Sequence, residues 1–240
     1  MRAGGRRTLG LVTAEPAGEL IGRGRDCDVF AAGPGRVLRR NRNGDSTERE
    51  ARTMRHVAAH GFPVPEVFDA DGPDIVMERL EGPTMLDDLA RRPWRVRSHC
   101  ESLADLIDRL GRVPLPDHEL ARHADGDTLA HLDLHPDNVQ LTSHGPVVID
   151  WTNASAGGAG LDAANTWLTI AVGRPDASWT ARAMAAIGRR LVVREFLRAT
   201  DVELACTQLA AALAFRRRDP NLTEMEVALM QAIVDAQPAR

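Results

Sequence analysis

The sequence predicts an α+β fold with two unequal lobes, a small antiparallel β lobe that carries one helix and a larger, mostly helical lobe. Short β-branched or aromatic segments separated by glycine, proline and aspartate occupy residues 20–80, and helical apolar patterns dominate from residue 84 onward. No internal repeat and no long linker divides the chain of 240 residues. We therefore expect a single domain, with an N-terminal lobe over residues 1–80 and a C-terminal lobe over residues 81–240.

The predicted β lobe consists of five short strands with a helix between the third and the fourth. The strand centres are Ile21, Val29–Phe30, Val37–Leu38, Val67–Phe68 and Ile75–Met77. Helical spacing of apolar residues predicts a helix over Thr47–His60, which Gly61 and Pro63 end. Thr47 and Glu50 have the spacing of a capping box at its start.

The predicted helical lobe contains one β-like interruption. Leu103, Leu106, Ile107 and Leu110 form one apolar stripe of a helix that ends at Gly111, a β-like region follows at 129–150, and helices resume over 161–234. Thr223 and Glu226 form a second capping box. The run Phe215–Arg218 could form an anion or nucleic-acid patch, but we favour the solvated end of a helix, because arginine there complements the helix dipole.

Composition narrows the classes of partner. A formal charge of −4 and a pI near 6.1 argue against a nucleic-acid-binding protein. The apolar runs at 9–14 and 209–215 are too short for a signal-peptide core or a membrane span, so we expect a cytoplasmic protein without a membrane partner. All 30 Lys or Arg residues are Arg, so chemistry that usually needs lysine must use arginine. Oligomeric state cannot be inferred from the sequence.

The segment His131-Leu-Asp-Leu-His-Pro-Asp-Asn138 carries the clearest chemical signal. Two apolar β segments flank a turn at 143–146, so Asp133, Asn138 and Asp150 can meet at one end of a hairpin. Phosphoryl transfer needs a carboxylate to accept the proton of an attacking hydroxyl, together with hard oxygen ligands for Mg²⁺. We therefore assign Asp133 as the catalytic base and Asn138 and Asp150 as metal ligands.

This block, followed by Ile-Asp-Trp at 149–151, resembles the aminoglycoside phosphotransferase and choline kinase branch of the protein-kinase-like fold. The resemblance covers roughly residues 20–165. It implies a bilobal kinase-like fold with ATP and Mg²⁺ as cofactors. It further implies that the acceptor is a hydroxyl of a small molecule, such as an antibiotic, an amino alcohol or a sugar.

The same resemblance implies nucleotide contacts in the N-terminal lobe. Gly22 and Gly24 would let backbone amides approach phosphate, and Arg39 would take the place of the lysine that relatives usually carry. Glu50 would pair with Arg39, although it could instead cap its helix, and Glu48 is an alternative partner. The other nucleotide contacts expected from the resemblance are Val29, Val37, Met77, Glu78, Leu80 and Ile149.

Several alternatives remain open at this point. His131 and His135 could hold a transition metal, although no third histidine has a suitable spacing. Only eleven residues separate Asp150 from Asp162, too few for the activation segment of a protein kinase. Asp162 fits a family aspartate that would support the metal-side loop, or it could serve only the helix dipole.

Charge in the C-terminal region and two unusual residues bear on the acceptor and on catalytic activity. Residues 161–240 contain nine acidic residues and ten Arg, which gives no support for a strongly cationic acceptor. A catalytically weak pseudokinase with a regulatory role is the alternative function, because Arg39 and Gln140 both depart from the pattern of relatives.

Overall fold

The computed structural model describes residues 18–24, 26–173 and 179–237, and side chains within 179–187 are not considered. The basic N-terminal segment and its apolar run at 9–14 therefore lie outside the described residues. Within the described ranges, no helix is both long and apolar enough to cross a bilayer.

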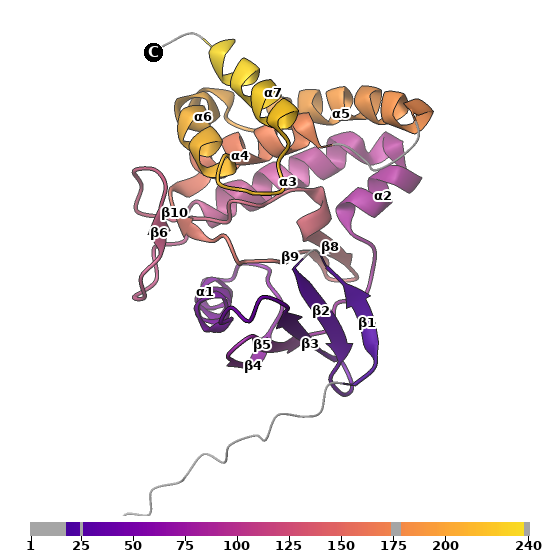
Figure 1. Ribbon diagram of the computed structural model, residues 1–240, viewed down its shortest axis with the longest axis vertical. Coiled ribbons are helices and arrows are strands. Elements are labelled where there is room, and N and C mark those ends of the chain that lie inside the picture. Colours follow the sequence, from indigo (N-terminus) through magenta and orange to yellow (C-terminus); the bar gives the residue numbers. More distant parts are fainter. Residues whose placement is uncertain (1–17, 25, 174–178, 238–240) are drawn as a thin grey trace, which may run out of the picture.

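A five-stranded antiparallel sheet with one helix forms the N-terminal lobe (Figure 1). The strands are β1 (Leu20–Arg23), β2 (Cys27–Ala31), β3 (Arg36–Asn41), β4 (Val67–Asp71) and β5 (Asp74–Glu78), in the order β1-β2-β3-β5-β4. Helix α1 (Glu48–Ala59) lies between β3 and β4 in the chain. All five predicted strands and the predicted helix are present, so the α+β fold class with a small antiparallel lobe is confirmed.

The C-terminal lobe is mostly helical. Its helices are α2 (Met85–Arg91), α3 (Val96–Leu110), α4 (Gly158–Val172), α5 (Trp179–Ala199), α6 (Val202–Arg216) and α7 (Glu224–Asp235), with short 3-10 turns η1 (Pro93–Arg95) and η2 (Pro136–Asn138). The hairpin of β8 (Val139–Thr142) and β9 (Gly145–Val148) lies between these helices and the N-terminal sheet (Figure 1). Three two-residue strands, β6 (Ala121–Arg122), β10 (Ser155–Ala156) and β7 (Leu129–Ala130), form a small sheet in that order.

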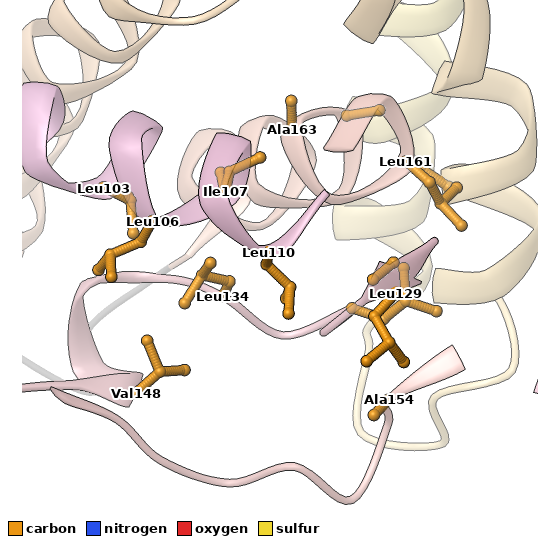
Figure 2. Close-up of a cluster of buried hydrophobic side chains, with 14 of the residues drawn as sticks. Leu103, Leu106, Ile107, Leu110, Leu129, Leu134, Val148, Ala154, Leu161 and Ala163 are labelled. Carbon is orange, nitrogen blue, oxygen red and sulfur yellow. The ribbon is translucent and has the colours of Figure 1, made fainter. Parts of the chain in front are cut away.

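The hydrophobic core supports the segment that connects β7 to β8. The predicted stripe of α3, from Leu103 to Leu110, is buried, and in Figure 2 Leu110 lies beside Leu134 while Ile107 is directed toward Ala163. Full burial of each leucine contributes about 1.5–3 kcal/mol relative to an exposed position. Because Leu132 and Leu134 are themselves fully buried, alternate residues of the segment are anchored, and Asp133 and His135 stay partly exposed.

The predicted capping box at the start of α1 is wrong. The Thr47 hydroxyl donates to the carbonyl oxygens of Asp74, at 2.7 Å, and Gly72, and makes no capping bond to the helix. Glu50 is drawn away from the helix terminus by Arg39, described below. The second box, Thr223 with Glu226, is confirmed with both reciprocal bonds. The helix predicted from residue 161 begins earlier, at Gly158.

The linker between the lobes is pressed onto strand β8 at Gly82. A Cβ atom on Gly82 would lie 2.0 Å from the carbonyl oxygen of Leu141, and its φ of +131° disfavours side chains. We expect Gly82→Ala to lower the free energy of unfolding by about 1–3 kcal/mol or more, measured by urea denaturation. Gly145→Ala is the matched control, because φ there is +118° but nothing lies within 4 Å of the added atom. Equal losses in both variants would contradict the close approach.

Candidate active site

Helix α4 holds the segment 131–138, which we call the catalytic loop, through bonds to its backbone. The Asp162 carboxylate accepts hydrogen bonds from the amides of His131 and Leu132, both at 2.7 Å. Asn165 donates to the carbonyl of Leu132 and Thr166 to that of Leu134, at 2.7 and 2.6 Å. These bonds stabilise Leu132 at a φ of +61°, which a leucine rarely adopts. Asp162 therefore supports the catalytic loop rather than the metal-side loop expected from the sequence.

Asp133 lies among groups that favour its ionised form. Its Oδ1 is 3.5 Å from His135 Nε2 and 3.5 Å from an Arg216 guanidinium nitrogen, and its Oδ2 accepts from Asn138 Nδ2 at 3.1 Å. Burial acts to raise the pKa of Asp133, but the hydrogen bond and charge of His135, with His131 and Arg216, outweigh it and lower the pKa to about 2. Asp133 is therefore a carboxylate at neutral pH.

Asn138 connects Asp133 to the strand that precedes Asp150. The Asn138 side-chain nitrogen donates to the Asp133 carbonyl at 2.9 Å, and the Asn138 backbone carbonyl accepts from the Ile149 amide at 3.0 Å. Because the nitrogen of the Asn138 amide is engaged, its Oδ1 is the atom that can bind a cation. Asp150 adopts a φ of +63° and its side chain is 49% exposed, with Oδ1 accepting from Thr152 at 3.0 Å. The Asn138 side-chain oxygen and the Asp150 carboxylate therefore both lie at the end of the catalytic loop.

His131 is a structural residue and not a metal ligand. Its Nε2 donates to the carbonyl of Ile149 at 3.1 Å, its Nδ1 accepts from the amide of Asp133 at 3.2 Å, and the two partners together define a neutral tautomer. Burial lowers the pKa of His131 to about 4, consistent with that neutral form. The ring packs against Trp151 at 4.7 Å between centroids. Since both ring nitrogens are engaged, the transition-metal alternative is excluded for His131.

The Arg39 guanidinium on β3 pairs with Glu50 on α1 through both of its terminal nitrogens, one of them at 2.9 Å. Both residues are buried, and Arg39 is also 3.9 Å from Asp150. Glu50 further accepts from the backbone amide of Trp151 at 3.1 Å, so one carboxylate connects β3, α1 and the residue after Asp150. Glu48, the alternative partner, makes no ion pair with Arg39. Arg39 Nε is buried and has no partner among the described residues.

The predicted nucleotide residues of the sheet share the face that carries Arg39. Val29 lies opposite Arg39 in the β2–β3 register, and Val37 lies opposite Met77 in the β3–β5 register. Directly opposed residues and alternate residues of a strand project on one face, so these four side chains line one surface.

The glycine turn closes the adjacent hairpin near the same end of the sheet. The Gly24 amide donates to the Cys27 carbonyl at 2.8 Å, and a Cβ on Gly24 would lie 2.8 Å from Cys27 Sγ. Gly22 pairs with Val29 across the hairpin and has more room, because its nearest neighbour would lie 3.7 Å from an added Cβ. The requirement for glycine is therefore stronger at Gly24 than at Gly22.

Only part of the linker backbone is available to a ligand. The Glu78 amide donates to the Glu66 carbonyl at 2.8 Å and the Arg79 amide to the Gly35 carbonyl at 2.9 Å. The backbone contacts expected from Glu78 to Leu80 stay a prediction, in which the amides of Glu78 and Arg79 already have partners within the protein. The amide of Leu80 has no hydrogen-bond partner in the described part of the chain.

Arg216 is the site residue that the sequence interpretation missed. It is 9% exposed, and its guanidinium is 3.5 Å from Asp133, whereas the following Arg217 and Arg218 are exposed. The prediction of a solvated helix end is therefore wrong for Arg216 and holds for its two neighbours. The signal was available, because Ala205, Leu209, Ala212 and Arg216 recur at the spacing of one helix face and all are buried.

Neutralising Glu50 is expected to affect both stability and nucleotide binding. Glu50→Gln keeps the shape but leaves the buried Arg39 with only the more distant Asp150 carboxylate, and removing one partner of a buried pair costs up to about 3–5 kcal/mol. We expect a lower urea midpoint and weaker Mg-ADP binding by calorimetry. Glu48→Gln, on the exposed first turn of the same helix, is the matched control and should change neither quantity. Wild-type stability in Glu50→Gln would contradict the argument.

The chain is similar to a known family in sequence and to solved structures in fold. The family model described as a phosphotransferase enzyme family matches residues 18–128 and 119–200. The crystal structure of aminoglycoside phosphotransferase APH(4)-Ia is 18% identical, covers 92% of this chain and 94% of its own, and has a TM-score of 0.63. A thermostable mutant of that protein, in ternary complex with AMP-PNP and hygromycin B, is 17% identical over 92% and 94% of the two chains, with a TM-score of 0.62.

A choline/ethanolamine kinase family protein from Mesorhizobium loti has the same fold. It is 14% identical, covers 94% of this chain and 90% of its own, and gives a TM-score of 0.57. No curated protein matches the chain in sequence. These structural similarities confirm the kinase-like fold predicted from the sequence.

Proposed function

The chain belongs to the phosphotransferase enzyme family, and from this premise we propose that it transfers the γ-phosphoryl group of Mg-ATP to a hydroxyl of a small molecule. The observation that carries the proposal is the hydrogen-bonded unit of Asp133 and Asn138 next to Asp150. An ionised carboxylate and two further oxygen-bearing side chains are the groups that this reaction requires of a protein.

The residues present fit a magnesium nucleotide. Mg²⁺ in nucleotide sites is held by one or two protein oxygens, with waters and phosphates completing its shell, and Asn138 and Asp150 offer such oxygens. The unpartnered Nε of Arg39 is a buried donor suited to a phosphate oxygen, and the open amide of Leu80 is suited to the base. When bound, Mg²⁺ offsets the negative charge of the phosphates.

The chain's own residues account for the acceptor side of the reaction. Asp133 is ionised, so its carboxylate can orient an acceptor hydroxyl and take its proton during the transfer. Asn138 holds that carboxylate by bonds to its Oδ2 and its backbone carbonyl. The four bonds from α4 keep the loop in place, so the orientation of Asp133 is prepared before an acceptor binds.

The segment after Asp150 supports a small acceptor rather than a peptide. Only residues 151–157 separate Asp150 from α4, and strand β10 within them pairs with β6 and β7. Such a short, paired segment offers no extended surface along which a peptide could dock. APH(4)-Ia, the relative with hygromycin B bound, and the choline/ethanolamine kinase family protein are consistent with a small-molecule acceptor.

The test is direct detection of a product. The full chain is incubated with Mg-ATP and a pooled panel of amino alcohols, sugars, hydroxy acids, nucleosides and aminoglycosides, and products are detected by mass spectrometry. We expect an acceptor heavier by one phosphoryl group, formed only when Mg²⁺ is present. If Mg-ATP binds by calorimetry but neither phosphorylated acceptor nor ADP forms, the pseudokinase alternative is supported instead.

Asp150→Asn is expected to weaken nucleotide binding only when Mg²⁺ is present. Loss of one charged ligand should lower Mg-ADP affinity by at least about 10-fold, with ADP affinity in EDTA unchanged. Isothermal titration calorimetry with and without Mg²⁺ separates the two effects. Asp108→Asn, exposed on α3, is the control and should behave as wild type. An equal loss in EDTA would show that Asp150 acts through the fold and not through a metal.

A further inference from the structure

We propose that Arg216 selects an acceptor that carries a carboxylate close to the hydroxyl that is phosphorylated. The inference rests on the proposed function, because it places the acceptor hydroxyl at Asp133. It concerns the acceptor side of the site, where the mutant of APH(4)-Ia binds hygromycin B in its ternary complex.

Arg216 is held in a fixed position relative to Asp133. It ends helix α6, whose buried face packs along α4 (Figure 1). Helix α4 is in turn bonded to the catalytic loop by Asp162, Asn165 and Thr166. The guanidinium and the carboxylate of Asp133 therefore belong to one rigid frame, which is the arrangement expected of a residue that recognises a ligand.

The Arg216 guanidinium has N–H donors without a close acceptor. One terminal nitrogen lies 3.5 Å from Asp133 Oδ1 and the other 3.4 Å from Asp219 Oδ2, both at the outer limit for hydrogen bonds. Its Nε is buried without a partner among the described residues. A buried guanidinium with five donors and only long contacts is under-satisfied, and an added anionic oxygen would complete it.

An acceptor at Asp133 must come within reach of Arg216. A hydroxyl that gives its proton to Asp133 lies about 2.6–3.2 Å from its carboxylate. The near guanidinium nitrogen is 3.5 Å from Asp133 Oδ1, so it lies at most about 6.7 Å from a hydroxyl bonded to that oxygen. A carboxylate on the same carbon as that hydroxyl, or on the neighbouring carbon, spans this distance with one hydrogen bond to Arg216.

The surrounding charges do not favour a cation at this position. Asp219 is the second carboxylate beside Arg216, but its Oδ1 accepts from the amide and side chain of Asn221 at 2.9 and 3.0 Å, and its Oδ2 faces Arg216. Asp133 is committed to the acceptor hydroxyl. A cationic group beside Arg216 would be repelled by the guanidinium, whereas an anionic oxygen there would meet a guanidinium whose present contacts are long.

The experiment compares four probes that share a polyol scaffold and differ in charge. Glycerate, glycerol 3-phosphate, glycerol and serinol are titrated by calorimetry into wild type, Arg216→Gln and Arg217→Gln, with Mg-ADP and again without nucleotide. Arg217→Gln is the matched control, because it removes the same charge from an exposed neighbour at the same helix end. Thermal denaturation and Mg-ADP binding show whether each variant is folded, and Arg216→Lys, which keeps the charge, is a second variant.

We expect wild type and Arg217→Gln to bind glycerate about 10- to 100-fold more tightly than glycerol or serinol, the range of one charge-assisted hydrogen bond. Arg216→Gln should lose that preference, and Arg216→Lys should recover part of it. Tighter binding of glycerol 3-phosphate than of glycerate would assign the anion as a phosphate and overturn the carboxylate. Binding of serinol in preference to both anions, equal binding of all probes, or no binding would overturn the inference. Failure of Mg-ADP to bind wild type would count against the proposed function instead, since the titrations without nucleotide still report on Arg216.

Discussion

Asp133→Asn is expected to reduce phosphoryl transfer by about 10²- to 10⁴-fold while leaving Mg-ADP affinity close to that of wild type. The substitution preserves the size of the side chain but removes the only group of the catalytic loop that is both ionised and bonded to Asn138. Because Asp133 is proposed to contact the acceptor and not the nucleotide, the loss should fall on turnover.

The measurement is the steady-state rate of ADP formation with an acceptor found in the product screen, together with Mg-ADP calorimetry. Asp137→Asn, an exposed carboxylate of the same loop, is the matched control and should retain at least about half of the wild-type rate. Turnover by Asp133→Asn at the wild-type rate would remove Asp133 from the mechanism. A parallel loss of nucleotide binding would instead indicate that the substitution disturbs the loop as a whole.

The pH dependence gives an independent view of the same residue. Since the pKa of Asp133 lies at about 2, the residue is ionised throughout the range in which the protein can be assayed. The activity of wild type should therefore show no acid limb from this residue above pH of about 4. An acid limb within that range would have to come from a group other than Asp133.

The sequence was informative where a structural feature depends on residues close together in the chain. The apolar stripe of α3, the hairpin after Asn138 and the spacing of Asp133, Asn138 and Asp150 are local patterns, and the structure contains each of them. The pairing of Arg39 with Glu50 was also anticipated, because strand alternation determines which side of β3 the arginine faces.

Features that depend on distant partners were predicted less well. The Thr47–Glu50 capping box satisfies a local rule, but Arg39 and two carbonyl oxygens bind those side chains instead. Arg216 was interpreted from its neighbours in a basic run, although its burial follows from the helix face that packs on α4. In both cases tertiary contacts outweigh local preference. A short stretch of sequence does not contain the distant residues that make those contacts.

Asp162 carries the second large prediction, which concerns stability. Burial raises the pKa of Asp162 from 3.8 to about 7, although the backbone amides of His131 and Leu132 act to lower it. In the unfolded chain the carboxyl ionises near its ordinary pKa, so between pH 4 and pH 7 the native state holds a proton that the unfolded state has lost. The free energy of unfolding should therefore fall as pH rises through this window, by up to about 4 kcal/mol in total.

Asp162→Asn isolates that contribution, because the amide cannot ionise. Its nitrogen would face a backbone amide, so near pH 4.5, where native Asp162 is protonated, the variant should be less stable than wild type by about 1–3 kcal/mol from the lost acceptor. The stability advantage of wild type should be largest near pH 4.5 and shrink toward pH 8, measured by urea denaturation across that range with Asp108→Asn as the control. Parallel curves for wild type and Asp162→Asn would show that Asp162 is ionised throughout. In that case its two 2.7 Å amide bonds would dominate over burial, and the loop that carries Asp133 would be held by a full charge at every pH.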